Sequence, residues 1–388
     1  MHHFESVVRK SARLLCDLLV AAMSVGVLVG CSGTENPREM AGEFSDPGLV
    51  NLLHQIPADR SSVALVFIND YAAIREAFSI ELPSEKASSE EIRAYREQLS
   101  TFPGAEPAFQ RSNGVHSNPV ELALRDEEAR ITLGFTALEI DREAWTPIFS
   151  VLQGEFAREA VEEALKRDER LGKYLSQKEF RGFEYFLWPG AIAQTPLSGR
   201  DRGLAVTPHY IYLTNRESER TIDFGLTLEG RSPSLADFQP FLELTETMSD
   251  LGALGFCLST DVYSEQSFGE LWRGAYGAAA VDQLLAQRLL IPYQAFAVGW
   301  GMSHETPQVY LITVQTTPAD AAENVARIRL RVEEGISLYD DRPWRDVFTI
   351  DDIHADGTVV IAKLNVSRAD ARIWSNIVGN LDSLWAAE

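Results

Sequence analysis

Val63-Ala64-Leu65-Val66-Phe67-Ile68 is an uninterrupted apolar run that predicts a buried β-strand. The run ends at Asn69-Asp70, and Tyr71 to Phe78 then has the spacing of a helix. A second apolar run, Leu254-Gly255-Phe256-Cys257-Leu258, is closed in the same way by Thr260-Asp261. A helical stretch precedes each run, so the order helix, strand, Asp and helix occurs twice. This repetition indicates an internal duplication, which we treat as a hypothesis.

Stretches of alternating polarity elsewhere in the chain predict antiparallel pairing. Arg130 to Thr136 and Phe183 to Leu187 each place apolar side chains at every second position, as expected for strands of an antiparallel sheet. Two hairpins are expected at 294–315 and 347–364, the second with Asp356-Gly357 in its turn. These patterns favour antiparallel sheets over a parallel α/β arrangement.

Apolar residues at spacings of three and four predict amphipathic helices in three stretches: 156–172, 317–335 and 367–385. Together with the strands, they predict an α+β fold of antiparallel sheets and packed amphipathic helices. We divide the body of the chain into two parts, at 47–230 and 231–388, which are either domains or related halves of one domain.

Residues 1–30 have the layout of a bacterial signal peptide. Arg9, Lys10 and Arg13 are basic, and the charge-free stretch from Leu18 to Gly30 is shorter than the roughly 20 residues that span a bilayer as a helix. The stretch ends in Leu28-Val29-Gly30-Cys31, which resembles the lipobox of bacterial lipoproteins. The resemblance implies cleavage before Cys31 and attachment of fatty acyl chains, such as palmitate, to this cysteine.

Residues 31–46 are polar and acidic and lack an apolar period, which predicts a flexible tether. The lipoprotein resemblance implies an extracytoplasmic, membrane-anchored protein of the cell envelope. Ser32 rather than Asp follows Cys31, which implies the outer membrane if the organism has two membranes, and otherwise the outer face of the cell membrane. The alternative is an ordinary secreted protein in which Cys31 lies near the cleavage site by chance.

The charge of the chain argues against two classes of partner. The net charge is −22 at pH 7, and removal of residues 1–30 makes it more negative. Such an excess of acid argues against nucleic acid and against lying flat on an anionic membrane. With Cys16 in the signal peptide and Cys31 lipidated, Cys257 has no partner for a disulfide. The mature chain must therefore be stabilised by its hydrophobic core.

The body carries no sound motif for catalysis, a cofactor or a metal. Asp352 to Gly357 resembles the opening of a calcium-binding EF-hand loop, but its third position is His354 and its twelfth is Lys363, so a hairpin turn is favoured. The acidic group between Asp340 and Asp356 is typical of solvated surface. Ser303-His304-Glu305 has the residue types of a catalytic triad, but adjacency in sequence does not form one. No histidine or glycine spacing matches a metal or nucleotide motif.

Four residues are candidates for a pocket or a surface contact. Asp70 and Asp261 end the two similar strands and could face one cleft as paired carboxylates, although an Asp at this position more often caps the following helix. Trp188 and Trp344 each lie beside a proline and are the aromatic residues best suited to exposed contacts, although packing in the core is the favoured interpretation.

Ile56-Pro57-Ala58-Asp59 and Phe180 to Tyr185, with the hairpin at 204–213, resemble uncharacterised bacterial exported proteins of unknown function, and no catalytic residue carries over. We expect a lipid-anchored binding or scaffolding module rather than an enzyme, with an envelope protein or a small molecule as its partner. One alternative is an envelope hydrolase with a carboxylate site between the halves. Another is a solute-binding lipoprotein of a transporter, although antiparallel patterning argues against its two parallel α/β lobes.

Overall fold

The computed structural model describes most of the chain from Gly48 onwards. The described residues are 48–84, 133–167, 172–188, 202–214, 218–339, 341–368 and 382–388, with single residues at 87, 88, 90, 91, 94, 95, 98, 169, 370, 373, 374 and 377.

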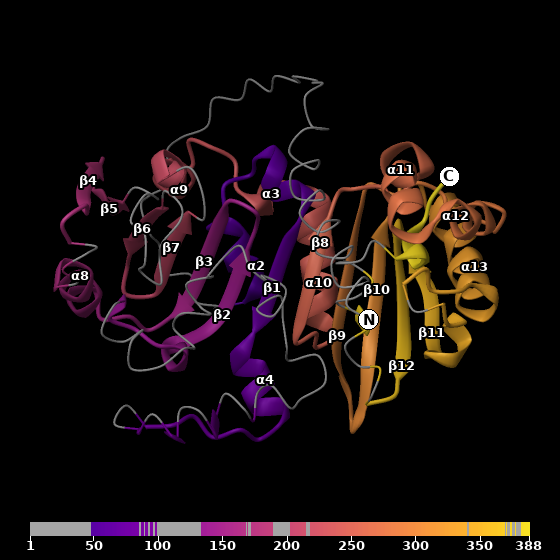
Figure 1. Cartoon of the computed structure of the whole chain (residues 1–388), viewed down its shortest axis with the longest axis horizontal. Helices are drawn as coiled ribbons and strands as arrows, with labels where there is room; N and C mark the ends of the chain where they lie inside the picture. Colours follow the sequence, from indigo (N-terminus) through magenta and orange to yellow (C-terminus); the bar gives the residue numbers. More distant parts are fainter. Residues whose placement is uncertain are drawn as a thin grey trace.

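Twelve strands of the described chain form one antiparallel sheet (Figure 1). They are β1 (Val66–Asp70), β2 (Ile140–Trp145), β3 (Phe149–Gly154), β4 (Ser176–Phe180), β5 (Phe183–Trp188), β6 (Arg202–Val206), β7 (Tyr210–Thr214), β8 (Gly255–Ser259), β9 (Ala295–Ser303), β10 (Thr306–Val314), β11 (Phe348–Asp356) and β12 (Val359–Val366). Their order across the sheet is β11-β12-β10-β9-β8-β1-β2-β3-β7-β6-β5-β4. The predicted α+β class with antiparallel pairing is confirmed.

Helices cover both faces of the sheet. One face, called the α10 face, carries α2 (Leu49–His54), α3 (Arg60–Ala64), α9 (Ile222–Leu228) and α10 (Gln239–Asp250). The other, called the α13 face, carries α4 (Tyr71–Ala77), α8 (Arg158–Arg167), α11 (Glu265–Tyr276), α12 (Ala278–Leu285) and α13 (Pro318–Glu334). Side chains alternate between the two cores, as the pleat of a strand requires: Phe256 and Leu258 lie on the α10 face, and Cys257 lies on the α13 face.

The two parts of the chain meet where β1 pairs with β8, with Val66 opposite Leu258 and Asn69 opposite Gly255. On each side of this pair the topology is similar. In each part, a first strand (β1 or β8) is followed by a helix and a hairpin (β2–β3 or β9–β10), and then by another helix and a final hairpin (β6–β7 or β11–β12). The last strand of the final hairpin, β7 or β12, lies beside the second strand of the earlier hairpin, β3 or β10. The part with β1 has an additional hairpin, β4–β5. The similarity is what a duplication would produce, and the common origin of the halves stays a hypothesis.

Two predicted strands differ from the observed structure. Asp59 caps α3 by accepting a hydrogen bond from the Ser62 N–H at 2.7 Å, so the strand expected from Val63 begins only at Val66. The prediction of a strand over 130–136 is wrong where the structure describes it: residues 133–136 form no strand. Gly134 has a φ of +75°, and a Cβ there would lie 2.5 Å from the backbone oxygen of Ala160 in α8. The chain bends at this glycine to pack under α8.

Both predicted hairpins are confirmed, as β9–β10 and β11–β12. The expected turn at Asp356-Gly357 joins β11 to β12, and Gly357 has the φ of +57° that such a turn requires. Thr317 caps α13, at the start of the helix expected over 317–335, by accepting a hydrogen bond from the Asp320 N–H at 3.1 Å.

Candidate functional site

Asp70 and Asp261 lie at opposite ends of the central strands, so the alternative of a shared carboxylate cleft is wrong. The Asp70 N–H donates to the Leu254 carbonyl at the start of β8, whereas Asp261 follows the other end of that strand. The extended chain from Leu254 to Asp261 spans roughly 20 Å at about 3.3 Å per residue. Because β1 and β8 run antiparallel, the residues that follow the two strands lie at opposite ends of the strand pair.

Asp70 is buried and serves as a structural cap. Its Oδ1 accepts a hydrogen bond from the Ala73 N–H at 2.9 Å, at the start of α4, and its Oδ2 pairs with Arg142 Nε at 2.7 Å. The carboxylate is thus held by α4 and by β2. It is not available as a free acid or base.

Asp261 is the less satisfied of the two carboxylates. Its N–H donates to the Ser259 hydroxyl at 3.0 Å, but among the described residues no side chain forms an ion pair with its carboxylate. Burial raises its pKa to about 6. Asp261 is therefore a largely buried carboxyl group whose charge acts on the neighbouring phenols of Tyr263 and Tyr293.

Trp188 and Trp344 are buried, so the favoured interpretation, packing in the core, is confirmed and the alternative of exposed contacts is wrong. Their exposed fractions are 2% and 0%, and both belong to the core on the α13 face. Trp344 stacks on Phe348 with ring centroids 5.5 Å apart. Pro343 precedes the short 3-10 helix Trp344–Asp346 and does not place the Trp344 ring at the surface.

A buried carboxylate that the sequence did not indicate lies under α4. Glu143 of β2 has an exposed fraction of 0%, and the Tyr71 hydroxyl donates to its Oε2 at 2.9 Å. Burial, with the neighbouring Glu143 charge, raises the pKa of Tyr71 well above its ordinary value, so the phenol remains a donor. Full enclosure excludes a substrate, and this pair fastens α4 to the sheet.

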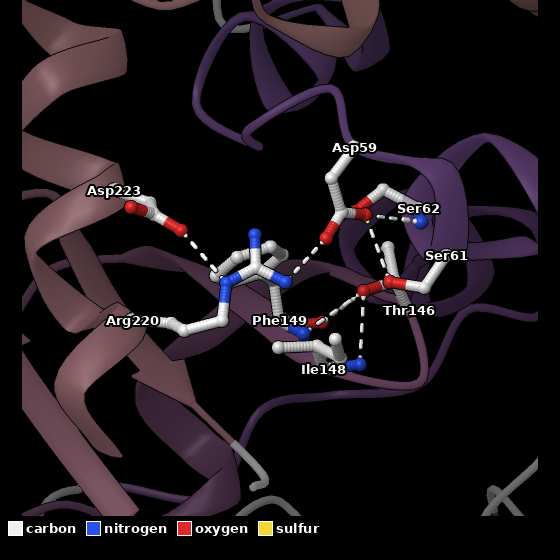
Figure 2. A network of polar contacts seen from close by, with 8 residues as sticks. All are labelled: Asp59, Ser61, Ser62, Thr146, Ile148, Phe149, Arg220 and Asp223. Atoms are coloured by element: carbon white, nitrogen blue, oxygen red, sulfur yellow. Dashed lines mark hydrogen bonds and ion pairs between the residues drawn. The ribbon is translucent and has the colours of Figure 1, made fainter. Parts of the chain in front are cut away.

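A half-buried ion-pair network lies beside the β2–β3 turn (Figure 2). Arg220 donates from Nη1 to Asp59 at 2.5 Å and from Nε to Asp223 at 2.9 Å, and its guanidinium lies 4.9 Å from the centroid of the Phe149 ring. Thr146 shapes the turn by accepting from the Phe149 N–H at 2.9 Å. The guanidinium is thus held by the nearby Asp223 and by two residues that are distant in sequence, Asp59 and Phe149.

Both carboxylate oxygens of Asp59 accept hydrogen bonds in this network. Burial raises its pKa, but hydrogen bonds from Ser62, Arg220 and Ser61 outweigh burial and lower the pKa overall. The Ser61 hydroxyl donates to Asp59 at 2.8 Å. Because Arg220 pairs with both Asp59 and Asp223, the network joins α3, the β2–β3 turn and α9. The same pairing occupies the guanidinium, so the network offers no open anion site.

The final hairpin offers an accessible surface of a different kind. α10 packs over β8, β9 and β10, and α13 packs on β11 and β12 from the opposite face, so the α10 face of β12 and β11 has no helix over it in the described chain (Figure 1). We call this surface the open face. It consists of seven residues, half-buried or exposed: Asp351, Asp352, His354, Asp356, Val359, Ile361 and Lys363.

The described residues contain no group of three or more His, Cys, Asp or Glu side chains arranged to hold a metal ion. No helix within the described ranges has the length and apolar character needed to cross a membrane. Leu28, Val29, Gly30 and Cys31 lie outside the described residues, so the lipobox stays a prediction.

Comparison with known proteins finds no matching family and no matching curated protein. Among solved structures, the chain is similar to TP0453 in crystal form I, at 10% identity and a TM-score of 0.40, over 85% of this chain and 97% of that chain. It is similar to crystal form III of TP0453 at 9% identity and a TM-score of 0.37, over 84% and 97% of the two chains. A likeness of this size carries no argument about activity.

Proposed function

We propose that this protein is a lipid-anchored, extracytoplasmic binding or scaffolding protein of the bacterial cell envelope. The observation that carries the proposal is Leu28-Val29-Gly30-Cys31, which closes a charge-free stretch behind three basic residues. Each buried methylene contributes about 0.8 kcal/mol, and one acyl chain alone holds only marginally, so two or more chains on Cys31 would give a stable anchor.

A binding role is favoured over a catalytic one by how the described acidic side chains are used. Asp59 and Asp70 are occupied by arginines and helix N-termini. Asp70 and Asp261, on which the hydrolase alternative rested, lie at opposite ends of their strands. The pairing of β1 with β8 in one sheet also argues against the hinge that a two-lobed solute-binding protein needs.

The anchor is tested by labelling with a radioactive or clickable palmitate in a bacterial host. We expect the unaltered chain to incorporate label and to sediment with membranes, and Cys31→Ala to lose both properties. Cys257→Ala is the matched control, because Cys257 is buried in the sheet and should not be acylated. Incorporation of label by Cys31→Ala would overturn the proposal.

A further inference from the structure

The open face combines two apolar side chains with an acidic border. Val359 and Ile361 stand on the same face of β12, opposite Val314 and Ile312 of β10, and both are half-buried. They extend the apolar core on the α10 face beyond the edge of α10. Asp356 lies beside Val359, and His354 beside Ile361, on the edge strand β11.

A β-bulge concentrates negative charge on this face. The register between β11 and β12 shifts between Ile350 and Asp352, so Ile350 and Ile353 both pack on the α13 face. The two residues between them, Asp351 and Asp352, therefore both lie on the open face. Gln308 of β10 donates to Asp351 at 3.3 Å, which agrees with this placement.

The cations on the open face do not balance its acids. Lys363 lies opposite Asp352, and the His354 ring is hydrogen-bonded to Asp352 at 2.8 Å. Asp351 and Asp356 have no lysine or arginine ion pair among the described residues. The surface therefore has an apolar centre and an unbalanced negative border, and its charge complement is a basic partner.

We propose that the open face binds a basic segment of another envelope protein. Such a segment would place apolar side chains over Val359 and Ile361, and lysine or arginine side chains against the aspartates. The inference rests on the proposed binding role and names its partner class, but it does not depend on the lipid anchor. Loss of acylation would refute the anchor and leave this surface unaffected.

Charge also decides between the basic segment and other occupants. A second copy that docked its open face on this one would bring aspartates against aspartates, which is unfavourable. An anionic lipid surface is disfavoured for the same reason. A basic protein segment satisfies both the acids and the apolar pair, whereas a neutral apolar segment would leave the carboxylates desolvated beside it.

The test measures binding of labelled octapeptides to the full chain by fluorescence anisotropy. The probe alternates lysine and valine, and the comparison peptides alternate glutamate with valine and lysine with serine. The face variant carries Asp351→Asn, Asp352→Asn and Asp356→Asn. The control variant removes the same charge at exposed positions elsewhere, with Glu270→Gln, Glu333→Gln and Glu334→Gln.

We expect saturable binding of the lysine–valine peptide, weakened about tenfold in the face variant and less than about twofold in the control, as for a few partly exposed ion pairs. Lys363→Gln removes the competing cation and should tighten binding about twofold to threefold. Absence of saturable binding, equal weakening in both triple variants, or equal binding of the glutamate–valine peptide would overturn the inference. Self-association through this face that displaces the peptide would also overturn it, in favour of a second copy.

Discussion

The final hairpins of the two halves, β6–β7 and β11–β12, hold corresponding places in the sheet but differ in their cover. β7 lies beside β3, as β12 lies beside β10. α9 closes the first hairpin on the α10 face, where Phe224 packs with its ring centroid 5.1 Å from those of both Phe149 and Tyr212. The second hairpin has no described helix on that face. Similar topology thus closes the core in one half and, in the described chain, leaves a sheet face without a covering helix in the other.

The largest effect is expected where the hairpin is covered. Phe224→Ala removes a fully buried ring from between Phe149 and Tyr212, and we expect it to lower the free energy of unfolding by about 3–5 kcal/mol. Urea denaturation followed by circular dichroism measures the loss. A loss below about 1 kcal/mol would mean that α9 adds little to the core, and the contrast between the two hairpins would disappear.

The parts of the fold that could be predicted from sequence are those that local chemistry determines. Apolar runs located β1 and β8, and Asp356-Gly357 located the turn of the last hairpin. β2 was not predicted because the charged run Asp141-Arg142-Glu143 lies in its centre and interrupts any apolar pattern. Arg142 and Glu143 are tolerated there because they pair with Asp70 and Tyr71, which are brought near only by folding. β4 was not predicted because four of its five side chains are exposed and show no apolar period.

For the open face, the sequence could predict which acidic residues are present but not how they are arranged. The acidic run between Asp340 and Asp356 was visible in the sequence as a surface cluster. The bulge that turns Asp351 and Asp352 to the same face has no sequence signal, since it is a shift in pairing with β12. Trp344 shows the converse: the acidic and proline-containing loop around it left exposure open as an alternative, whereas its ring fills the core against Phe348.

The two strand-end aspartates allow a second test of the comparison between halves. Asp261→Asn should raise the free energy of unfolding at pH 7 by about 3 kcal/mol, because burial raises the pKa of Asp261 from 3.8 to about 6. Asp70→Asn, at the position after β1, should be destabilising, since the charge paired with Arg142 is lost. Thermal melts of the two variants measure both effects.

The pH dependence gives the sign of the Asp261 effect. An acid whose pKa is raised by folding binds more protons when folded, so it weakens the fold as pH rises from about 4 to 6. The advantage of Asp261→Asn should therefore be present at pH 7 and vanish near pH 4. An advantage that is equal at both pH values would assign the effect to packing and not to the buried charge.

The smallest effect is expected on the open face, and it tests most directly whether that face is free. Ile361 is half-buried on the α10 face of β12, while its neighbour Val360 is fully buried on the α13 face. Ile361→Ala should cost about 0.5–1 kcal/mol of unfolding free energy, and Val360→Ala about 2 kcal/mol, although isoleucine is the larger side chain. Urea denaturation of both variants makes the comparison. If Ile361→Ala proves the more costly change, the face is already covered in the isolated protein, and a basic partner segment would have no surface on which to bind.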